Sequence, residues 1–192
     1  MRQMRRIRLL LLLSVVCLTA SGQSVRAQPR DLTAQEAYRI GLAPARKAGL
    51  DQLILLTSVD RAVETRDTIT LGANGKREVW NLVFGHRGSQ RILIVNIKNG
   101  GVASARESRD FVRDDEFIQA SELVVDSPYL YEQAVKLRLR PGQSFARGYH
   151  YIVRREWQTV FFTVVGYDER QRMKKLHFDA RTGKWIGITS RS

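Results

Sequence analysis

The chain has 192 residues, of which 43% are hydrophobic, and a formal net charge of +13. This length suits one domain or two small ones and allows a hydrophobic core without metals or disulfides. The hydrophobic content is ordinary for a soluble globular protein. The single cysteine, Cys17, lies in the N-terminal segment, so the rest of the chain uses no disulfide.

Residues 1–27 have the pattern of a cleaved secretory signal peptide. Residues 1–8 are basic and residues 9–20 are mostly apolar. Val25 and Ala27 then place small side chains at the two positions that a signal peptidase reads. The alternative, a retained anchor helix, needs roughly 18 to 20 apolar residues, more than this run provides. We therefore expect a periplasmic or secreted protein with no transmembrane span after cleavage.

The basic charge of the chain indicates possible classes of partner. Five arginines of the signal segment have no acidic counterpart, so cleavage lowers the net charge from +13 to +8. This charge favours polyanionic surfaces such as anionic glycans, lipid headgroups or acidic proteins. A solvated surface that maintains solubility is an equal alternative. Nucleic acid is disfavoured as a partner by the export signal and by the lack of an aromatic-basic motif.

The first unit, residues 28–106, is expected to be a helix followed by an antiparallel meander. Thr33 and Glu36 form a capping box, and apolar residues follow at helical spacing, with Pro44 as a kink. Asn74-Gly75 is a tight-turn signal, which predicts a hairpin at that point. The expected strands cover residues 53–57, 68–71, 77–84 and 91–98.

Residues 107–125 are rich in charge and are interpreted as a linker. The second unit, residues 126–192, begins with a helix for which Ser127 is the expected N-cap and Pro128 the first residue. Strands follow, including 160–166 and a last hairpin that ends near residue 188. The predicted fold class is α+β, with two tandem units that each pack a helix on an antiparallel β-meander.

Two glycine corners and one helix start carry a resemblance to a known family. Asp179-Ala-Arg-Thr-Gly183 matches an Asp-x-x-Thr-Gly corner, Asn96-Ile-Lys-Asn-Gly100 is a looser version, and residues 126–134 match the helix opening. Together, residues 31–188 resemble the PepSY family of secreted or membrane-tethered bacterial domains. The resemblance implies a non-enzymatic domain that binds or restrains peptidases. The hairpin around Asn74-Gly75 departs from the family pattern.

The sequence shows no constellation typical of catalysis or metal binding. His86, His150 and His177 lack metal-ligand spacing. Residues 142–146 resemble a nucleophile elbow but lack its second glycine and its strand-to-helix order. Trp157 is interpreted as core or sheet packing. We therefore expect no enzymatic activity, no cofactor and no metal.

The candidate partner site is a basic cluster with one aromatic residue on the C-terminal ribbon: Arg170, Arg172, Lys174, Lys175, Arg181, Lys184 and Trp185. The expected function is that of an exported binding module of the bacterial cell envelope that holds a protein partner. A peptidase is the partner class that the PepSY resemblance implies. The alternative is adhesion to envelope polyanions, either anionic glycans or lipid headgroups, which predicts binding that weakens steeply with salt.

Overall fold

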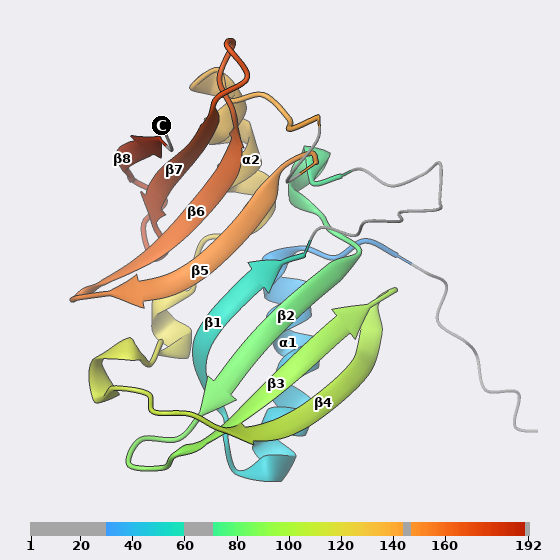
Figure 1. The fold of residues 1–192 in the computed structure, drawn as a ribbon, viewed down its shortest axis with the longest axis vertical. Coiled ribbons are helices and arrows are strands. Elements are labelled where there is room, and N and C mark those ends of the chain that lie inside the picture. Colours follow the sequence, from blue (N-terminus) through green and yellow to red (C-terminus); the bar gives the residue numbers. More distant parts are fainter. Residues whose placement is uncertain (1–29, 60–70, 144–146, 191–192) are drawn as a thin grey trace, which may run out of the picture.

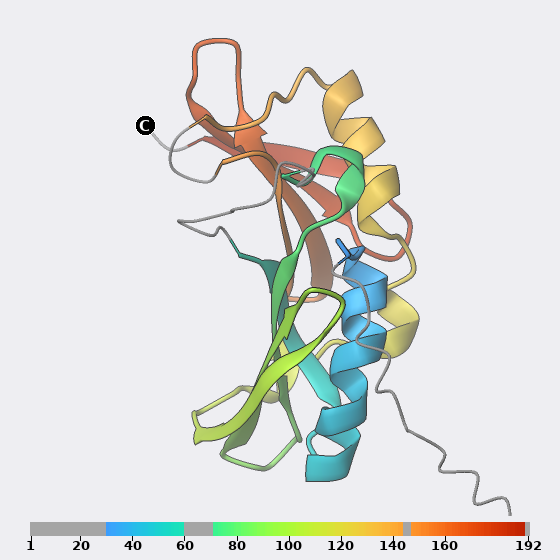
Figure 2. The same cartoon turned by 90° about the vertical axis from the view of Figure 1, so that its right-hand side faces the viewer.

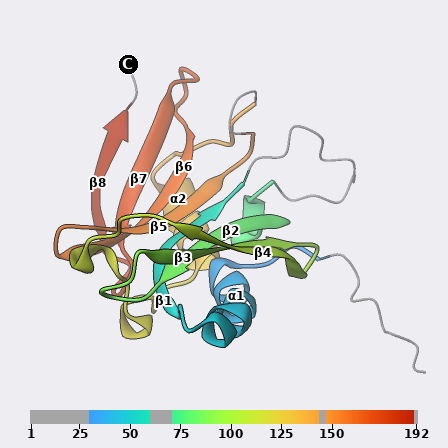
Figure 3. The same ribbon diagram turned by 60° about the horizontal axis from the view of Figure 1, so that its bottom comes forward.

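The computed structural model describes residues 30–59, 71–143 and 147–190, and its strands form one eight-stranded antiparallel sheet (Figure 1). The strand order across the sheet is β4-β3-β2-β1-β5-β6-β7-β8. The strands are β1 (Gln52–Ser58), β2 (Val79–Gly85), β3 (Arg91–Lys98), β4 (Gly101–Arg109), β5 (His150–Glu156), β6 (Thr159–Tyr167), β7 (Met173–Asp179) and β8 (Trp185–Ser190). The strands at the two ends of the sheet point in different directions (Figure 3), as accumulated strand twist requires.

Two α-helices, α1 (Ala34–Ala48) and α2 (Ser127–Lys136), lie on the same face of the sheet (Figure 2). Short 3-10 helices form η1 (Ala73–Gly75), η2 (Asp114–Glu116) and η3 (Ala120–Glu122). The opposite face of the sheet is not covered by either α-helix. No helix of the described ranges is long and apolar enough to cross a membrane.

The prediction of two tandem helix-plus-meander units is wrong, because the strands form a single continuous sheet. β1 and β5 pair antiparallel at its centre, with Leu55 opposite Arg154 and Thr57 opposite Ile152. The buried residues also form one cluster, which includes Leu32 before α1 and Ala180 after β7. A continuous sheet leaves fewer strand edges exposed than two separate sheets would.

The segment interpreted as a charged linker contributes to the fold. Residues 107–109 complete β4, and η2 and η3 follow. Phe117 and Ile118 are buried, and Ile118 forms a β-bridge with Leu53. The predicted signal, residues 1–27, lies outside the described residues.

The helix starts differ in how well the sequence predicts them. The capping box of α1 is confirmed: the Thr33 hydroxyl accepts a hydrogen bond from the Glu36 amide, and the Glu36 carboxylate accepts one from the Thr33 amide. The N-cap of α2 is Asp126 rather than Ser127, which is the first helical residue and is fully buried. The Ser127 hydroxyl accepts a hydrogen bond from the Ala34 amide of α1 instead of capping α2.

The predicted hairpin around Asn74-Gly75 is not seen in the described residues, and residues 68–70 of its expected first strand lie outside them. Both residues have positive φ, as the turn signal indicates, but they belong to η1. β2 pairs with β1 and β3 instead. Gly75 packs against the start of α2, where a Cβ would lie 2.3 Å from the Pro128 nitrogen. This close approach joins the first half of the chain to the second.

Candidate functional site

β7 divides the predicted basic cluster into two groups. One group lies at the turn between β6 and β7 and in the first residues of β7, the other follows Asp179 at the opposite end of β7, and Lys175 lies further along β7. The cluster is therefore contiguous in sequence but not in space. The first group is Arg170, Arg172 and Lys174, and the second is Arg181, Lys184 and Trp185.

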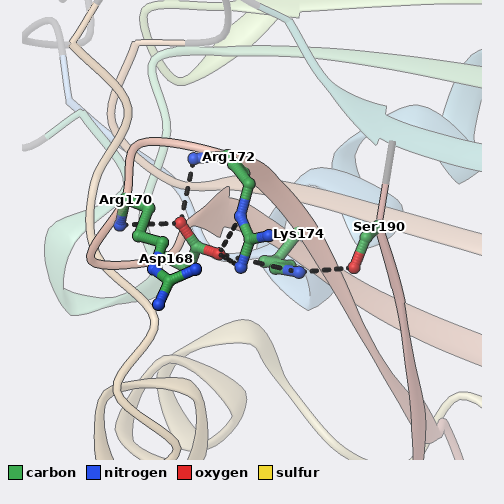
Figure 4. A network of polar contacts seen from close by, with 5 residues as sticks. All are labelled: Asp168, Arg170, Arg172, Lys174 and Ser190. Atoms are coloured by element: carbon green, nitrogen blue, oxygen red, sulfur yellow. Dashed lines mark hydrogen bonds and ion pairs between the residues drawn. The ribbon is translucent and has the colours of Figure 1, made fainter. Parts of the chain in front are cut away.

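Asp168 offsets the charge of the first group (Figure 4). Its Oδ1 accepts hydrogen bonds from the Arg170 and Arg172 amides, each at 2.9 Å, and its Oδ2 accepts one from Arg172 Nε at 2.8 Å. Lys174 Nζ lies 3.6 Å from the same carboxylate and donates to Ser190 Oγ. The Arg172 amide is the largest cause that lowers the pKa of Asp168 to about 2. These basic groups therefore stabilise the hairpin and offer less charge to a polyanion.

Asp179 organises the turn between β7 and β8, as the sequence predicts. Its Oδ1 accepts hydrogen bonds from the Arg181 amide at 3.0 Å and from the Thr182 amide at 2.7 Å. Burial opposes ionisation of Asp179, but the hydrogen bonds from Thr182 and Arg181 keep its pKa below the ordinary value. Gly183, with φ of 73°, packs so closely on α2 that a Cβ would meet the Tyr129 ring at 2.6 Å. The motif is a structural corner.

β8 is an edge strand with an exposed apolar surface. Within the described residues it pairs with β7 only. Trp185 and Ile188 are each 51% exposed and Ile186 is 46% exposed. No charged residue occurs between Trp185 and Ser190, and the single register shift lies at the start of the strand. Because natural edge strands are usually protected by charges, proline or bulges, β8 is an edge that another strand can join.

β4, at the other end of the sheet, has the protection that β8 lacks. It carries Arg106, Glu107 and Arg109 along an exposed strand. Glu107 also forms an ion pair with Arg91 of β3 at 2.7 Å. The two edges of the sheet thus differ in their charged residues: those of β4 oppose the addition of another strand, whereas β8 lacks them.

Lys175 and Lys184 flank the apolar part of β8. Lys175 lies opposite Thr189 near one end of the strand, and Lys184 directly precedes Trp185 at the other. Both are exposed. The ion pairs found here among the described residues involve Arg172 and Lys174 but neither of these lysines. The edge is therefore apolar in the middle and basic at both ends.

A groove of about 500 Å³ lies elsewhere, between β1, the end of β5 and η2. β5 pairs with β1 only from Leu55 to Thr57, and beyond that point Ile118 bridges to Leu53 in its place. The groove lies at the point where the pairing of β5 with β1 ends. Its lining consists of Ile54, Leu55, Arg113, Asp115, Glu116, Arg154, Arg155, Glu156 and Trp157.

The charges of this groove are balanced and paired. Arg113 Nε lies 3.3 Å from Asp115 and 3.2 Å from Glu116. Arg154 forms an ion pair with Glu156. Arg155 pairs with Glu122 outside the groove and donates from Nε to the Phe117 carbonyl at 3.0 Å. The lining contains three arginines and three acidic residues, so the groove does not favour a ligand of either sign.

Trp157 is the residue that sequence reasoning missed. It lies in the turn between β5 and β6, it is 87% exposed, and its φ is 58°. The interpretation of Trp157 as core or sheet packing is wrong. A bulky residue at positive φ is a conformational outlier, because such turn positions usually hold glycine, asparagine or aspartate. The strand-like segments on both sides of Trp157-Gln158 were the signal that could have placed it in a two-residue turn.

Comparisons with known proteins concern the fold. No protein-family model matches the chain, and no curated protein matches it in sequence. A crystal structure described as that of a "putative lipoprotein" from Clostridium difficile 630 has a similar fold, with a TM-score of 0.54 and 8% sequence identity. The match covers 78% of this chain and 88% of that one. At this identity the likeness shows the architecture alone, and the PepSY resemblance stays a prediction.

Proposed function

We propose that this protein is an exported binding module that holds a partner protein by adding one of its strands to β8. The observation that carries the proposal is the exposed apolar edge formed by Trp185, Ile186 and Ile188 without an intervening charge. In strand addition, main-chain hydrogen bonds supply affinity, and alternate side chains supply specificity.

The charge around β8 defines the partner's chemistry. Lys175 and Lys184 lie at opposite ends of the apolar edge, so the best complement is an extended segment with apolar residues in the middle and acidic residues at its ends. A second copy of this chain is a poorer complement. Antiparallel pairing of two β8 strands brings Lys184 of one copy toward Lys175 of the other, and like charges repel.

The polyanion alternative has less support in the geometry. A polyanion needs several uncompensated cations on one surface. Here Arg172 and Lys174 lie against Asp168, and β7 separates them from Arg181 and Lys184. The arrangement thus favours a protein partner.

The proposed compartment is the cell envelope. The signal pattern of residues 1–27 supports export, and the description of the structural neighbour as a lipoprotein fits an envelope or extracellular location. A peptidase is the partner class implied by the PepSY resemblance. Measuring the rate of a captured peptidase with and without saturating protein distinguishes restraint from simple binding.

Charge placed on β8 tests strand addition directly. The immobilised wild-type protein, Ile188→Lys and the control Val102→Lys are incubated with an envelope extract, and the captured partner is then purified for titration. Val102 is the matched position because it is 44% exposed on the opposite edge strand. We expect Ile188→Lys to weaken the partner's affinity at least tenfold and Val102→Lys to leave it within twofold.

Amide hydrogen exchange locates the contact. In the complex with the purified partner, the β8 amides should exchange more slowly while those of β4 are unchanged. Equal affinity for wild type and Ile188→Lys would contradict the proposal. Binding to anionic vesicles or glycans that survives Ile188→Lys but disappears at about 0.5 M salt would favour the polyanion alternative.

A further inference from the structure

A second surface of the molecule has the features of a ligand site independent of β8. The lining of the groove between β1, β5 and η2 combines the apolar residues Ile54 and Leu55 with charged side chains and the indole of Trp157. The groove volume of about 500 Å³ lies within the range of ligand-binding clefts. We propose that this groove binds a neutral saccharide, with the Trp157 indole as the platform for a sugar ring.

The position of Trp157 is the first step of the argument. Its side chain is 87% exposed, so it adds little to the hydrophobic core, yet its φ of 58° is unfavourable for a bulky residue. Strained residues that gain no packing are concentrated at functional sites. An exposed aromatic face beside a groove offers a flat apolar surface, which matches the C–H face of a sugar ring.

The polar lining is the second step. A sugar hydroxyl is both a donor and an acceptor, so it is best satisfied by neighbouring acceptors and donors. The pairs Arg113–Asp115 and Arg154–Glu156 present both kinds of group, and their side chains keep 41% to 62% exposure. The pairs therefore retain hydrogen-bonding capacity for a ligand while each guanidinium is held beside a carboxylate.

The third step is the balance between positive and negative side chains in the groove, which distinguishes neutral from charged ligands. Three arginines and three acidic residues line the groove, so neither an anionic nor a cationic ligand gains a net attraction. An extended apolar peptide would also take these ion pairs out of water without offering them hydrogen bonds in return. A neutral ligand with several hydroxyl groups needs no net charge attraction, and its hydroxyls can hydrogen-bond to the charged side chains.

Tryptophan fluorescence provides the test. The purified protein is titrated with N-acetylglucosamine tetramer, cellotetraose and maltotetraose. Trp80 is fully buried, so changes in emission report on Trp157 and Trp185. We expect at least one probe to give a saturable change in the millimolar range that is kept in Trp185→Ala. Because Trp157→Ala removes the reporter itself, its binding is measured by isothermal titration calorimetry, where the heat of binding seen for wild type and Trp185→Ala should be absent. The affinity should change less than twofold between low salt and about 0.5 M salt.

The folding of the variants is checked by thermal unfolding. Trp157→Asn should unfold at the same temperature as wild type or higher, because asparagine tolerates positive φ. A lower unfolding temperature would show that Trp157 is kept for stability and would overturn the assignment. The proposal also fails if none of the probes gives a saturable change, if Trp157→Ala still binds, or if an apolar peptide binds where the saccharides do not.

Discussion

The Asp126 carboxylate accepts a hydrogen bond from the Gln35 amide at 3.1 Å, which ties the start of α2 to the start of α1. The same oxygen accepts one from the Ser127 amide at 2.7 Å. Two helix N-termini, each with a partial positive charge, therefore share one carboxylate. This contact helps to hold both helices on one face of the sheet, and it joins segments that are 91 residues apart.

Asp126→Ala tests the shared cap. The substitution removes the acceptor for amides of two helices, so we expect the free energy of unfolding to fall by about 2–3 kcal/mol. The control is Thr33→Ala, which removes the side-chain cap of α1 alone and should cost about 1 kcal/mol. Urea denaturation measures both. Equal losses for the two variants would mean that the Gln35 contact contributes nothing.

Gly75 and Gly88 have nearly the same φ, 78° and 75°, but different surroundings. A Cβ at Gly75 would lie 2.4 Å from the Pro128 Cα, whereas one at Gly88 has no neighbour within 4 Å. Gly88→Ala should cost about 1–2 kcal/mol for the left-handed backbone alone. Gly75→Ala should cost about 1–3 kcal/mol more because α2 must shift. Thermal unfolding of the two variants would reveal whether η1 packs on α2 as described.

His177 connects the last strands of the sheet. Its Nδ1 lies 3.0 Å from Thr163 Oγ1 and its Nε2 lies 2.9 Å from Thr189 Oγ1. Burial lowers the pKa of His177 from its ordinary value of 6.5, and Arg154 and Lys175 lower it further against the opposing charge of Glu156. The unfolded chain therefore binds the proton more tightly. The stability contributed by neutral His177 is present above pH 6.5 and is lost as the pH falls through the lowered pKa.

The measurement is the free energy of unfolding between pH 7.5 and 5. His177→Gln cannot titrate, so its stability should decline less over this interval than that of the wild type. His86 is exposed in the turn after β2, and His86→Gln is the control for replacing a surface histidine by glutamine. Identical profiles for wild type and His177→Gln would contradict the proposed coupling.

Asp168 should titrate far below an ordinary aspartate. The Arg172 amide and side chain and the Arg170 amide lower its pKa to about 2 from an ordinary 3.8. The stabilisation from ionised Asp168 is therefore complete above about pH 4 and is lost as the pH falls through about 2. NMR titration of the carboxyl carbon measures this directly. In Asp168→Asn, exchange of the Arg170 and Arg172 amides should accelerate; a midpoint near 4 in the wild type would contradict the network.

Features that depend on residues a few positions apart could be predicted from the sequence. The capping box of Thr33 and Glu36 and the corner around Asp179 are both present, because each is made by side chains that bond to nearby amides. The number of sheets could not be predicted. Apolar residues in β1 indicate a buried strand, but they do not identify β5 as its neighbour across about a hundred residues.

The sequence did not reveal the edge strand β4, the division of the basic cluster or the exposure of Trp157. β4 is exposed along nearly its whole length, so it lacks the alternation that predicts a strand and was interpreted partly as a linker. The basic cluster was defined by closeness in sequence, but an extended strand of seven residues separates its two ends. Trp157 was missed because aromatic residues are usually packed, and only its turn position shows otherwise.

The pairing of β1 with β5 has a consequence for the order of folding. We expect the two central strands to be among the last to meet, because Leu55 and Arg154 are far apart in the chain and closing so long a loop is entropically costly. Until β5 has been synthesised and has paired with it, the apolar Leu53–Leu56 segment of β1 is a strand edge with no neighbour on one side. During synthesis or export this edge is the place where a chaperone would be needed most.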